Sequence, residues 1–300
     1  RRLGKNEDAI RCYKQALEIN PESIHSKVEL THLKQLICEW ENIDTLFDDI
    51  KNNISNKSKG KVSPFTVLSM PNFNSKDHLK VATNWSEQIK IKPLSKVSTP
   101  IKNKLTIGYL SADFRNHPLY YLIFDILKSH NKKMFNIKLF YSGPDETSCE
   151  HEEFKKLDCQ FFNISNESDD KGAQLIRDEK VDILVDLSGF TQNSRSFIAA
   201  YKPARYHINW LGFAGTMGFH HEKPLFDFIL SDKYIIPDGK INDYAEKVLY
   251  LPHCYQPNIA DRPKLTSKTK RDYGFNDHTF IYASFSQPIK ITKDQFNIWI

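Results

Sequence analysis

Cysteines are few in this sequence and follow no pattern. Its 300 residues include five cysteines, an odd number, and none belongs to a Cys-x-x-Cys pair. A disulfide framework and a structural zinc site are therefore not indicated, and a cytoplasmic, reducing compartment fits this usage best. Long hydrophobic runs are missing as well, because no apolar stretch approaches the roughly 20 residues that span a bilayer. We expect no membrane association.

Charge of one sign is also scarce. Lys plus Arg exceed Asp plus Glu by 42 − 37 = 5, and no Lys/Arg stripe of the kind that binds a phosphate backbone is present. We therefore expect no nucleic-acid partner. The one local excess of lysine, Lys51 to Lys61, lies among Asn, Ser and Gly and is typical of a solvated linker.

The first residues have the spacing of a helical repeat. Small and apolar side chains recur from Leu3-Gly4 through Ala9-Ile10 and Leu17 to Pro21, which matches the second half of a tetratricopeptide repeat. Such a unit cannot bury its face alone, and the chain begins with Arg1 rather than Met. The sequence therefore predicts a fragment of a longer protein that starts inside a repeat array.

From Lys104 onward, strand and helix patterns alternate, which predicts a doubly wound α/β domain. The expected strands are Leu105–Leu110, Ile137–Tyr141, Phe161–Ile164, Ile183–Leu187, Tyr206–Leu211 and Phe228–Leu230. An amphipathic helix is expected over Asp77–Ile89, a connection over Pro252–Pro263, a fresh strand over Thr279–Phe285 and a helix from Thr292. We divide the chain into the end of the repeat region (1–50), a linker with a connecting helix (51–103), a first lobe (104–262) and the start of a second lobe (275–300).

Three polar segments directly follow expected strands: Asp113–Pro118, Gly189–Arg195 and Gly212–Gly218. In an open parallel sheet, ligands bind outside the carboxyl ends of the strands, where helix N-termini contribute partial positive charge. A histidine, an arginine, hydroxyls and glycines at one edge predict a site for a polar, anionic ligand.

Four ordered motifs carry a specific resemblance. They are Gly108–Pro118 (GYLSADFRNHP), Ile183–Thr191 (ILVDLSGFT), Trp210–Gly218 (WLGFAGTMG) and Tyr282–Thr292 (YASFSQPIKIT). Together they resemble the O-linked N-acetylglucosamine transferases of glycosyltransferase family 41, in particular the bacterial members. The resemblance covers essentially the whole chain. It implies a two-lobed GT-B enzyme behind tetratricopeptide repeats, which moves N-acetylglucosamine from UDP-GlcNAc to protein Ser or Thr with inversion and without metal or other cofactor.

The resemblance also implies partners and an inactive fragment. Protein acceptors would bind through the repeats and the cleft, and homo-oligomers could form through the preceding repeats. Because family members hold the donor mainly on the second lobe, almost all of which lies after Ile300, we expect this chain alone to be inactive.

His117 is the central candidate of the first motif. It precedes Pro118, which suits the first turn of a helix, and an imidazole can accept a hydroxyl proton or bind a sugar or phosphate oxygen. The resemblance makes His117 a site residue and a candidate base, although a structural histidine is the common alternative. Asp113 could orient the imidazole or cap the helix, and Asn116 lies on the same loop.

The second lobe would supply the counter-charge for the leaving diphosphate. No Asp-x-Asp pair occurs anywhere in the chain, so the usual sequence cue for a metal is absent. Lys290 matches the family's phosphate-contacting lysine, and Gln287 matches a neighbouring polar contact. Taken alone, Lys290 would be an ordinary surface lysine.

The remaining candidates lie on the other two loops. Gly212, Ala214, Gly215 and Thr216 match the family's loop beside donor and acceptor, although glycines after a strand can simply form a turn. Thr191 and Arg195 are candidates on their own loop, with structural pairing as the alternative for Arg195.

Departures from the family pattern leave a second hypothesis open. Ala214 stands where Pro is common, Leu119 where Thr or Ala is common, and Ile89 where many members have His. A non-catalytic scaffold that binds partners through repeats is therefore the alternative, with a related O-fucosyl- or N-glucosyltransferase as another. The adjacent His220 and His221 diverge and have no evident third ligand, so we expect an exposed loop there rather than a metal site.

Overall fold

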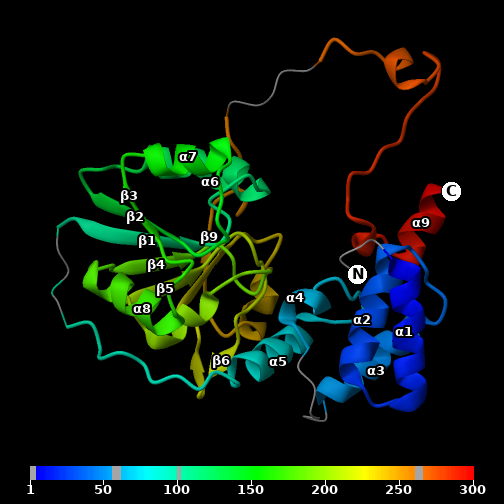
Figure 1. Ribbon diagram of the computed structural model, residues 1–300, viewed down its shortest axis with the longest axis horizontal. Helices are drawn as coiled ribbons and strands as arrows, with labels where there is room; N and C mark the ends of the chain where they lie inside the picture. Colours follow the sequence, from blue (N-terminus) through cyan, green and yellow to red (C-terminus); the bar gives the residue numbers. More distant parts are fainter. Residues whose placement is uncertain (1–4, 56–61, 99, 101–102, 261–265) are drawn as a thin grey trace.

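The structure is a computed structural model that describes residues 5–55, 62–98, 100, 103–260 and 266–300. Figure 1 shows a helical group and an α/β domain, with helices α4 (Pro64–Val67) and α5 (Ser75–Ser86) between them. The predicted features at Leu3-Gly4, Asn56–Lys61 and Pro263 lie outside the described residues. Among the described residues, no helix is long and apolar enough to cross a membrane.

Five helices precede the sheet: α1 (Asn6–Ile19), α2 (Ile24–Leu36), α3 (Ile43–Ser55), α4 (Pro64–Val67) and α5 (Ser75–Ser86). The apolar periodicity buries Val28 of α2 against Phe47 and Ile50 of α3, so the predicted helical region is confirmed for the described residues. The linker expected from Lys51 is wrong at its start. Helix α3 continues through Ser55 because Lys51 donates to Asn72 O at 2.9 Å and forms an ion pair with Asp77 at 2.8 Å.

Helix α5 lies between the two groups. Asn74 begins it with a capping box in which Asp77 is the reciprocal partner. Val81 packs into the core of the helical group, whereas its neighbour Ala82 packs with Phe213 and Met217 of the α/β domain. One helix therefore contributes to both cores.

The main sheet has seven parallel strands in the order β3-β2-β1-β4-β5-β8-β9. Their bounds are Leu105–Ser111 (β1), Phe135–Tyr141 (β2), Gln160–Asn163 (β3), Ile183–Asp186 (β4), Tyr206–Asn209 (β5), Phe228–Ser231 (β8) and Lys247–Tyr250 (β9). All six strands predicted between Lys104 and Leu230 are present, and the doubly wound α/β class is confirmed. The seventh strand, β9, was not predicted.

Helices cover both faces of the sheet (Figure 1). They are α6 (Pro118–Ser129), α7 (Cys149–Lys156) and α8 (Asp169–Asp178), with 3-10 turns η1 (Ser196–Tyr201) and η2 (Asp238–Asp243). Side chains alternate between two cores, as the strand period requires. Tyr109 and Leu139 point into one core, and their neighbours Leu110 and Phe140 into the other.

The segment around the paired histidines is not a plain loop. Strands β6 (Phe219–His220) and β7 (Lys223–Pro224) form a small antiparallel hairpin. His221 and Glu222 take positive φ at its turn, which is the geometry of a two-residue hairpin connection. His220 is half-buried and its Nδ1 lies 3.1 Å from Ser86 O. The expectation of an exposed loop is therefore wrong for His220, although His221 is exposed.

Residues 266–300, the C-terminal segment, leave the α/β domain and reach the helical group (Figure 1). They contain η3 (Arg271–Tyr273), η4 (Pro288–Lys290) and α9 (Lys293–Trp299). The helix from Thr292 is confirmed, because Thr292 caps α9. The strand predicted over Thr279–Phe285 is wrong: within this segment no strand forms, since no neighbouring strand satisfies its backbone groups.

Candidate active site

Three loops leave neighbouring strands at the carboxyl edge of the sheet. Residues 112–118 follow β1, residues 187–195 follow β4 and residues 211–218 follow β5, and we call them the rim loops. The order β3-β2-β1-β4-β5 means that the chain winds outward from β1 in one direction and resumes on its other side at β4. Ligands bind at such a switch point in doubly wound sheets, and the first two rim loops flank it. Ser111 Oγ and Ser188 Oγ meet there at 3.5 Å.

His117 is the N-cap of helix α6. Its Nδ1 accepts the backbone N–H of Leu119 at 3.2 Å, and Pro118 occupies the first turn. Asp113, the other capping candidate, instead forms an ion pair with Arg115 at 3.0 Å and lies 3.9 Å from His117 Nδ1. The histidine itself, not the aspartate, therefore performs the capping role.

The capping hydrogen bond determines which ring nitrogen of His117 carries the proton. Burial lowers the pKa of His117 and the charge of Arg115 lowers it further, whereas the Asp113 carboxylate raises it. The ring is therefore neutral at pH 7, and Nδ1 carries no proton because it accepts the Leu119 N–H. The single ring proton lies on Nε2. His117, which is half-buried, thus has a hydrogen-bond donor at Nε2.

The rim cation is Arg115, which the sequence reasoning did not single out. Its Nε donates to Ala112 O at 3.3 Å and its Nη2 to Asp113 at 3.0 Å. Arg115 also acts electrostatically on His117, on Tyr141 and on Glu146 of the loop after β2. Proximity to the histidine motif is the signal that could have identified it.

The loop after β2 joins the first rim loop. Ser142 N donates to Ser111 O at 3.0 Å, and Asn116 N donates to Ser148 Oγ at 3.0 Å. Asn116 is exposed, so its side chain faces solvent beside His117. The edge therefore includes a loop that no motif had indicated.

Thr191 lies on the second rim loop at the sheet edge, whereas the Arg195 side chain points away from this edge. The Thr191 hydroxyl donates to Ser188 O at 2.9 Å. Arg195 donates to Asp169 Oδ1 at 2.7 Å and to Ile164 O at 2.6 Å, beside the start of α8. These contacts match the structural alternative for Arg195, which packs against α8.

The third rim loop is packed too closely for side chains at its glycines. A Cβ on Gly212 would lie 2.3 Å from Leu187 O, and one on Gly215 would lie 2.7 Å from the Phe213 ring. Gly218 has φ +74°. Gly212 is exposed and Ala214 half-exposed, whereas Gly215 and Thr216 are buried. Only the first half of this loop can therefore touch a ligand.

Buried polar side chains underlie the rim loops, and the sequence analysis missed them. Asp186 accepts the N–H groups of Ser188 and Gly189 at 2.7 and 3.1 Å. Its register partner Asn209 donates to Gly215 O at 3.0 Å. Glu246, directly before β9, accepts from the third rim loop. Burial raises the pKa of Asp186 to about 6 and that of Glu246 to about 7.

Lys290 and Gln287 do not lie at the rim. Both are exposed in the C-terminal segment, and Ile289 between them is buried. Gln35 Nε2 of α2 lies 3.5 Å from Ile289 O, and Trp40 Nε1 donates to Ile291 O at 3.3 Å. The structure thus brings His117, Asp113, Asn116, Pro118, Thr191, Gly212 and Ala214 to one edge, and holds Lys290 and Gln287 against the helical group.

Two of the three departures from the family pattern, Ile89 and Leu119, are buried apolar residues, whereas Ala214 is half-exposed. Ile89 packs with Phe190 and Phe213 under the rim loops. Leu119, which follows the histidine cap, packs in the core around Phe114. Both side chains point away from solvent and stabilise the rim from below.

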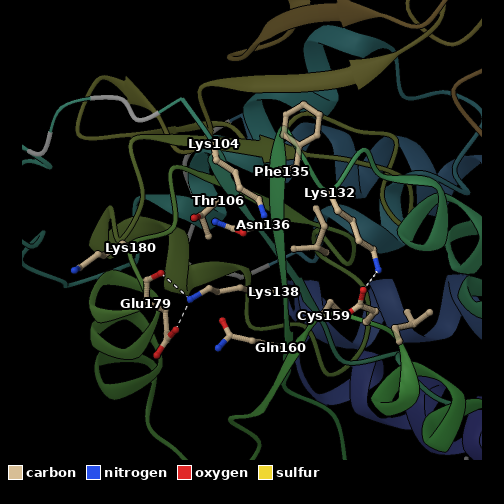
Figure 2. Close-up of a pocket in the computed structure, with 13 residues that line it drawn as sticks. Lys104, Thr106, Lys132, Phe135, Asn136, Lys138, Cys159, Gln160, Glu179 and Lys180 are labelled. Atoms are coloured by element: carbon tan, nitrogen blue, oxygen red, sulfur yellow. Dashed lines mark hydrogen bonds and ion pairs between the residues drawn. The ribbon is translucent and has the colours of Figure 1, made fainter.

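A separate cleft of about 720 Å³ opens at the opposite, amino-terminal edge of the sheet. Figure 2 shows Lys138 extending to Glu179, and Lys132 forms an ion pair with Asp158. Lys104 and Lys180 also line it. Half of its lysines are thus neutralised by protein carboxylates, and no rim loop lines it.

No group of three His, Cys, Asp or Glu side chains is placed to hold a metal ion, within the residues that the structure describes. The His207–Asp227 pair, at 3.2 Å, is also closed to ligands, because His207 Nε2 accepts the N–H of Ala204.

Comparisons with known proteins agree on one family. The sequence model of Glycosyl transferase family 41 matches residues 86–265. The probable UDP-N-acetylglucosamine–peptide N-acetylglucosaminyltransferase SEC of Arabidopsis thaliana is 28% identical over 293 residues, which cover 90% of this chain and 30% of that protein. The UDP-N-acetylglucosamine–peptide N-acetylglucosaminyltransferase of Caenorhabditis elegans is 25% identical over 237 residues, covering 74% and 20%.

A solved structure shares the fold. A mutant O-GlcNAc transferase of Thermobaculum terrenum superposes with a TM-score of 0.74 and 18% sequence identity, covering 99% of this chain and 56% of that one. The chain thus spans less than a third of the length of these curated relatives.

Proposed function

Because the chain belongs to Glycosyl transferase family 41, we propose that the protein of which it is part transfers N-acetylglucosamine from UDP-GlcNAc to Ser or Thr hydroxyls of proteins. The names of the relatives support this donor and acceptor. The observation that carries the proposal is the capped, neutral His117 at the switch point of the sheet. A scaffold that had lost catalysis would need the cap of α6 but not a hydrogen-bond donor at Nε2 beside it.

The rim residues would bind the sugar and its phosphates. The Nε2–H of His117 would donate a hydrogen bond to a sugar or phosphate oxygen. Arg115, with a side chain 25% exposed, would add positive charge beside it. Because Nδ1 already accepts the Leu119 N–H, we assign His117 the role of donor rather than general base.

The transfer itself would proceed with inversion. The acceptor hydroxyl oxygen attacks the anomeric carbon from the face opposite the diphosphate, and the bond from that carbon to the diphosphate breaks. UDP leaves with the negative charge, and the hydroxyl proton is released to solvent. Lys290 would stabilise this charge in place of a metal ion. That role requires Lys290 to lie across the cleft from the rim, on a second lobe.

The separation of Lys290 from the rim loops supports the expectation that the 300-residue chain is inactive on its own. Lys290 and Gln287 are held on the helical group, whereas His117 lies at the sheet edge. We expect no sugar transfer by this chain alone, and detectable turnover by it would contradict this expectation.

Replacement of His117 in the full-length protein tests the proposal. Asn is a good N-cap, so His117→Asn keeps the cap of α6 but removes the Nε2–H donor. We expect the transfer of labelled sugar from UDP-GlcNAc to fall by about 10²–10³, the usual loss for a donor that stabilises a transition state. His117→Ala should lose the same activity and, in addition, about 1 kcal/mol of stability with the cap.

Two results would contradict the proposal. Wild-type protein that binds acceptor proteins without incorporating sugar would favour the scaffold. A His117→Asn variant with wild-type transfer would show that His117 serves only to cap the helix.

A further inference from the structure

Glu246 is a buried carboxylate whose two oxygens are both occupied by the third rim loop. Its side chain is 3% exposed. Oε2 accepts the hydroxyl of Thr216 at 2.7 Å, and Oε1 accepts the backbone N–H of Met217 at 2.6 Å. The residue lies directly before β9, two places from β5 in the sheet order, and 30 positions after Thr216 in the sequence, so these bonds join distant parts of the chain.

The Thr216 hydroxyl has no capacity left for another partner. It donates its only proton to Glu246, and its oxygen accepts the N–H groups of Gly218 at 3.2 Å and Ala245 at 3.1 Å. A hydroxyl has one donor and two acceptor sites, so all three are in use. Thr216 therefore faces the carboxylate and not a ligand.

We propose that Glu246 is the positioning residue of the third rim loop: its carboxylate fixes Thr216 and Met217, and so sets where Gly212 and Ala214 meet the bound sugar donor. This inference rests on the proposed function. Asn209 holds the same loop from below through Phe213 O at 3.1 Å and Gly215 O at 3.0 Å. Ser86 of α5 holds it from outside, donating to Met217 O at 2.7 Å.

The geometry requires a carboxylate at position 246. A glutamine would point its amide NH₂ either at the Met217 N–H, which is itself a donor, or at the Thr216 oxygen, whose acceptor sites are filled. Either placement leaves a buried donor unpaired. An aspartate lacks one methylene and cannot reach both partners. Two acceptor oxygens and the length of the side chain are therefore both specified.

The test compares Glu246→Gln with Asp227→Asn in the full-length protein. Asp227 accepts the backbone N–H and the Nδ1–H of His207 near the amino end of β5, and its side chain is 39% exposed. Its replacement therefore disturbs a half-exposed pair and keeps the Glu246 bonds to Thr216 and Met217. With Glu246→Gln we expect the Met217 and Gly218 amides to exchange hydrogen at least about fivefold faster, because an unpaired donor weakens the loop locally. Leu119 and Leu187 amides should not change, and Asp227→Asn should leave all four unchanged.

Activity provides the second readout, at a temperature where circular dichroism shows both variants folded. We expect Glu246→Gln to lower kcat for sugar transfer at least about fivefold, with Asp227→Asn at the wild-type rate. Equal kcat in Glu246→Gln and wild type would overturn the positioning role, even with faster exchange. Unchanged exchange at Met217 would overturn it directly.

Two further comparisons keep the test decisive. If Glu246→Gln does not fold, Thr216→Val takes its place and should speed hydrogen exchange at the Gly218 and Ala245 amides. Thr216→Ser keeps the hydroxyl and should not speed this exchange. Equal exchange in the two Thr216 variants would overturn the proposal. If wild-type protein transfers no sugar, the proposed function fails. The exchange of Met217 then still decides whether Glu246 fixes the loop.

Discussion

The rim loops and the C-terminal segment both carry motifs of the same family, yet the structure holds them in opposite ways. The rim loops are tied by buried side chains such as Asp186 and Glu246. In the C-terminal segment, Phe280, Tyr282 and Phe285 are 75%, 91% and 99% exposed. A motif therefore acquires a fixed geometry only where the chain also supplies the neighbours that bury it.

Large aromatic side chains give the greatest contrast. Phe114 of the first rim loop is fully buried and packs 5.0 Å from the Phe154 ring. We expect Phe114→Ala to lower the free energy of unfolding by about 3–5 kcal/mol, through lost burial and a cavity. Phe285→Ala should change it by less than about 0.5 kcal/mol. Urea unfolding measures both, and similar losses would break the comparison.

Two glycines with positive φ give the next contrast. Gly189 of the second rim loop has φ +56°, and a Cβ there would lie 2.3 Å from the Phe213 Cβ, whereas Gly274 has φ +78° and nothing within 4 Å. We expect Gly189→Ala to cost about 2–4 kcal/mol, through strain and collision. Gly274→Ala should cost about 1 kcal/mol or less. Thermal unfolding measures both losses of stability. A larger loss for Gly274→Ala than for Gly189→Ala would mean that the rim is loosely packed and would contradict the prediction.

The buried carboxylates make the rim sensitive to pH. Burial raises the folded-state pKa of Asp186 to about 6 from 3.8, and that of Glu246 to about 7 from 4.5. Between these values the folded protein binds more protons than the unfolded chain, so these groups make stability fall as pH rises from about 4 to 7. The loss is at most about 3 kcal/mol for each group.

Asp186→Asn sharpens this prediction. The variant should lose the part of the slope between about pH 4 and 6. Urea unfolding across this range measures the slope. An identical slope in the variant would mean that Asp186 does not titrate in that window.

The smallest effect concerns a contact between the C-terminal segment and Trp40 of the helical group. Trp40 donates to Ile291 O at 3.3 Å, and its ring lies 5.2 Å from the Phe296 ring. Trp40→Phe should loosen α9 by about 1 kcal/mol through the lost hydrogen bond, seen as faster exchange at the Phe296 amide. Trp299→Phe is the control, because Trp299 is 56% exposed. Equal effects would show that Trp40 does not anchor the helix.

The sequence was sufficient for the sheet and for the edge where its loops meet. Apolar runs such as Ile183–Leu187 are buried on both faces, and burial on this scale leaves a pattern that can be read without coordinates. The motif around His117 was equally readable, because a strand end followed by His-Pro specifies a helix start.

What the sequence could not provide were contacts between distant residues. Arg195 turns toward Asp169, and the Glu246 bonds to Thr216 and Met217 span about thirty positions. Neither set of contacts produces a periodic pattern in the local sequence. The strand expected over Thr279–Phe285 failed for the related reason that a β pattern needs a partner strand to pair with.

The strand order has a metric consequence for the binding edge. Neighbouring strands lie about 4.8 Å apart, and β1, β4 and β5 are consecutive in the sheet. Their three loops therefore arise within about 10 Å of one another, a span comparable to one monosaccharide and the phosphate beside it. Hydrogen bonds between the strands fix this spacing, so the distance between the three loops can change only if the strand order changes.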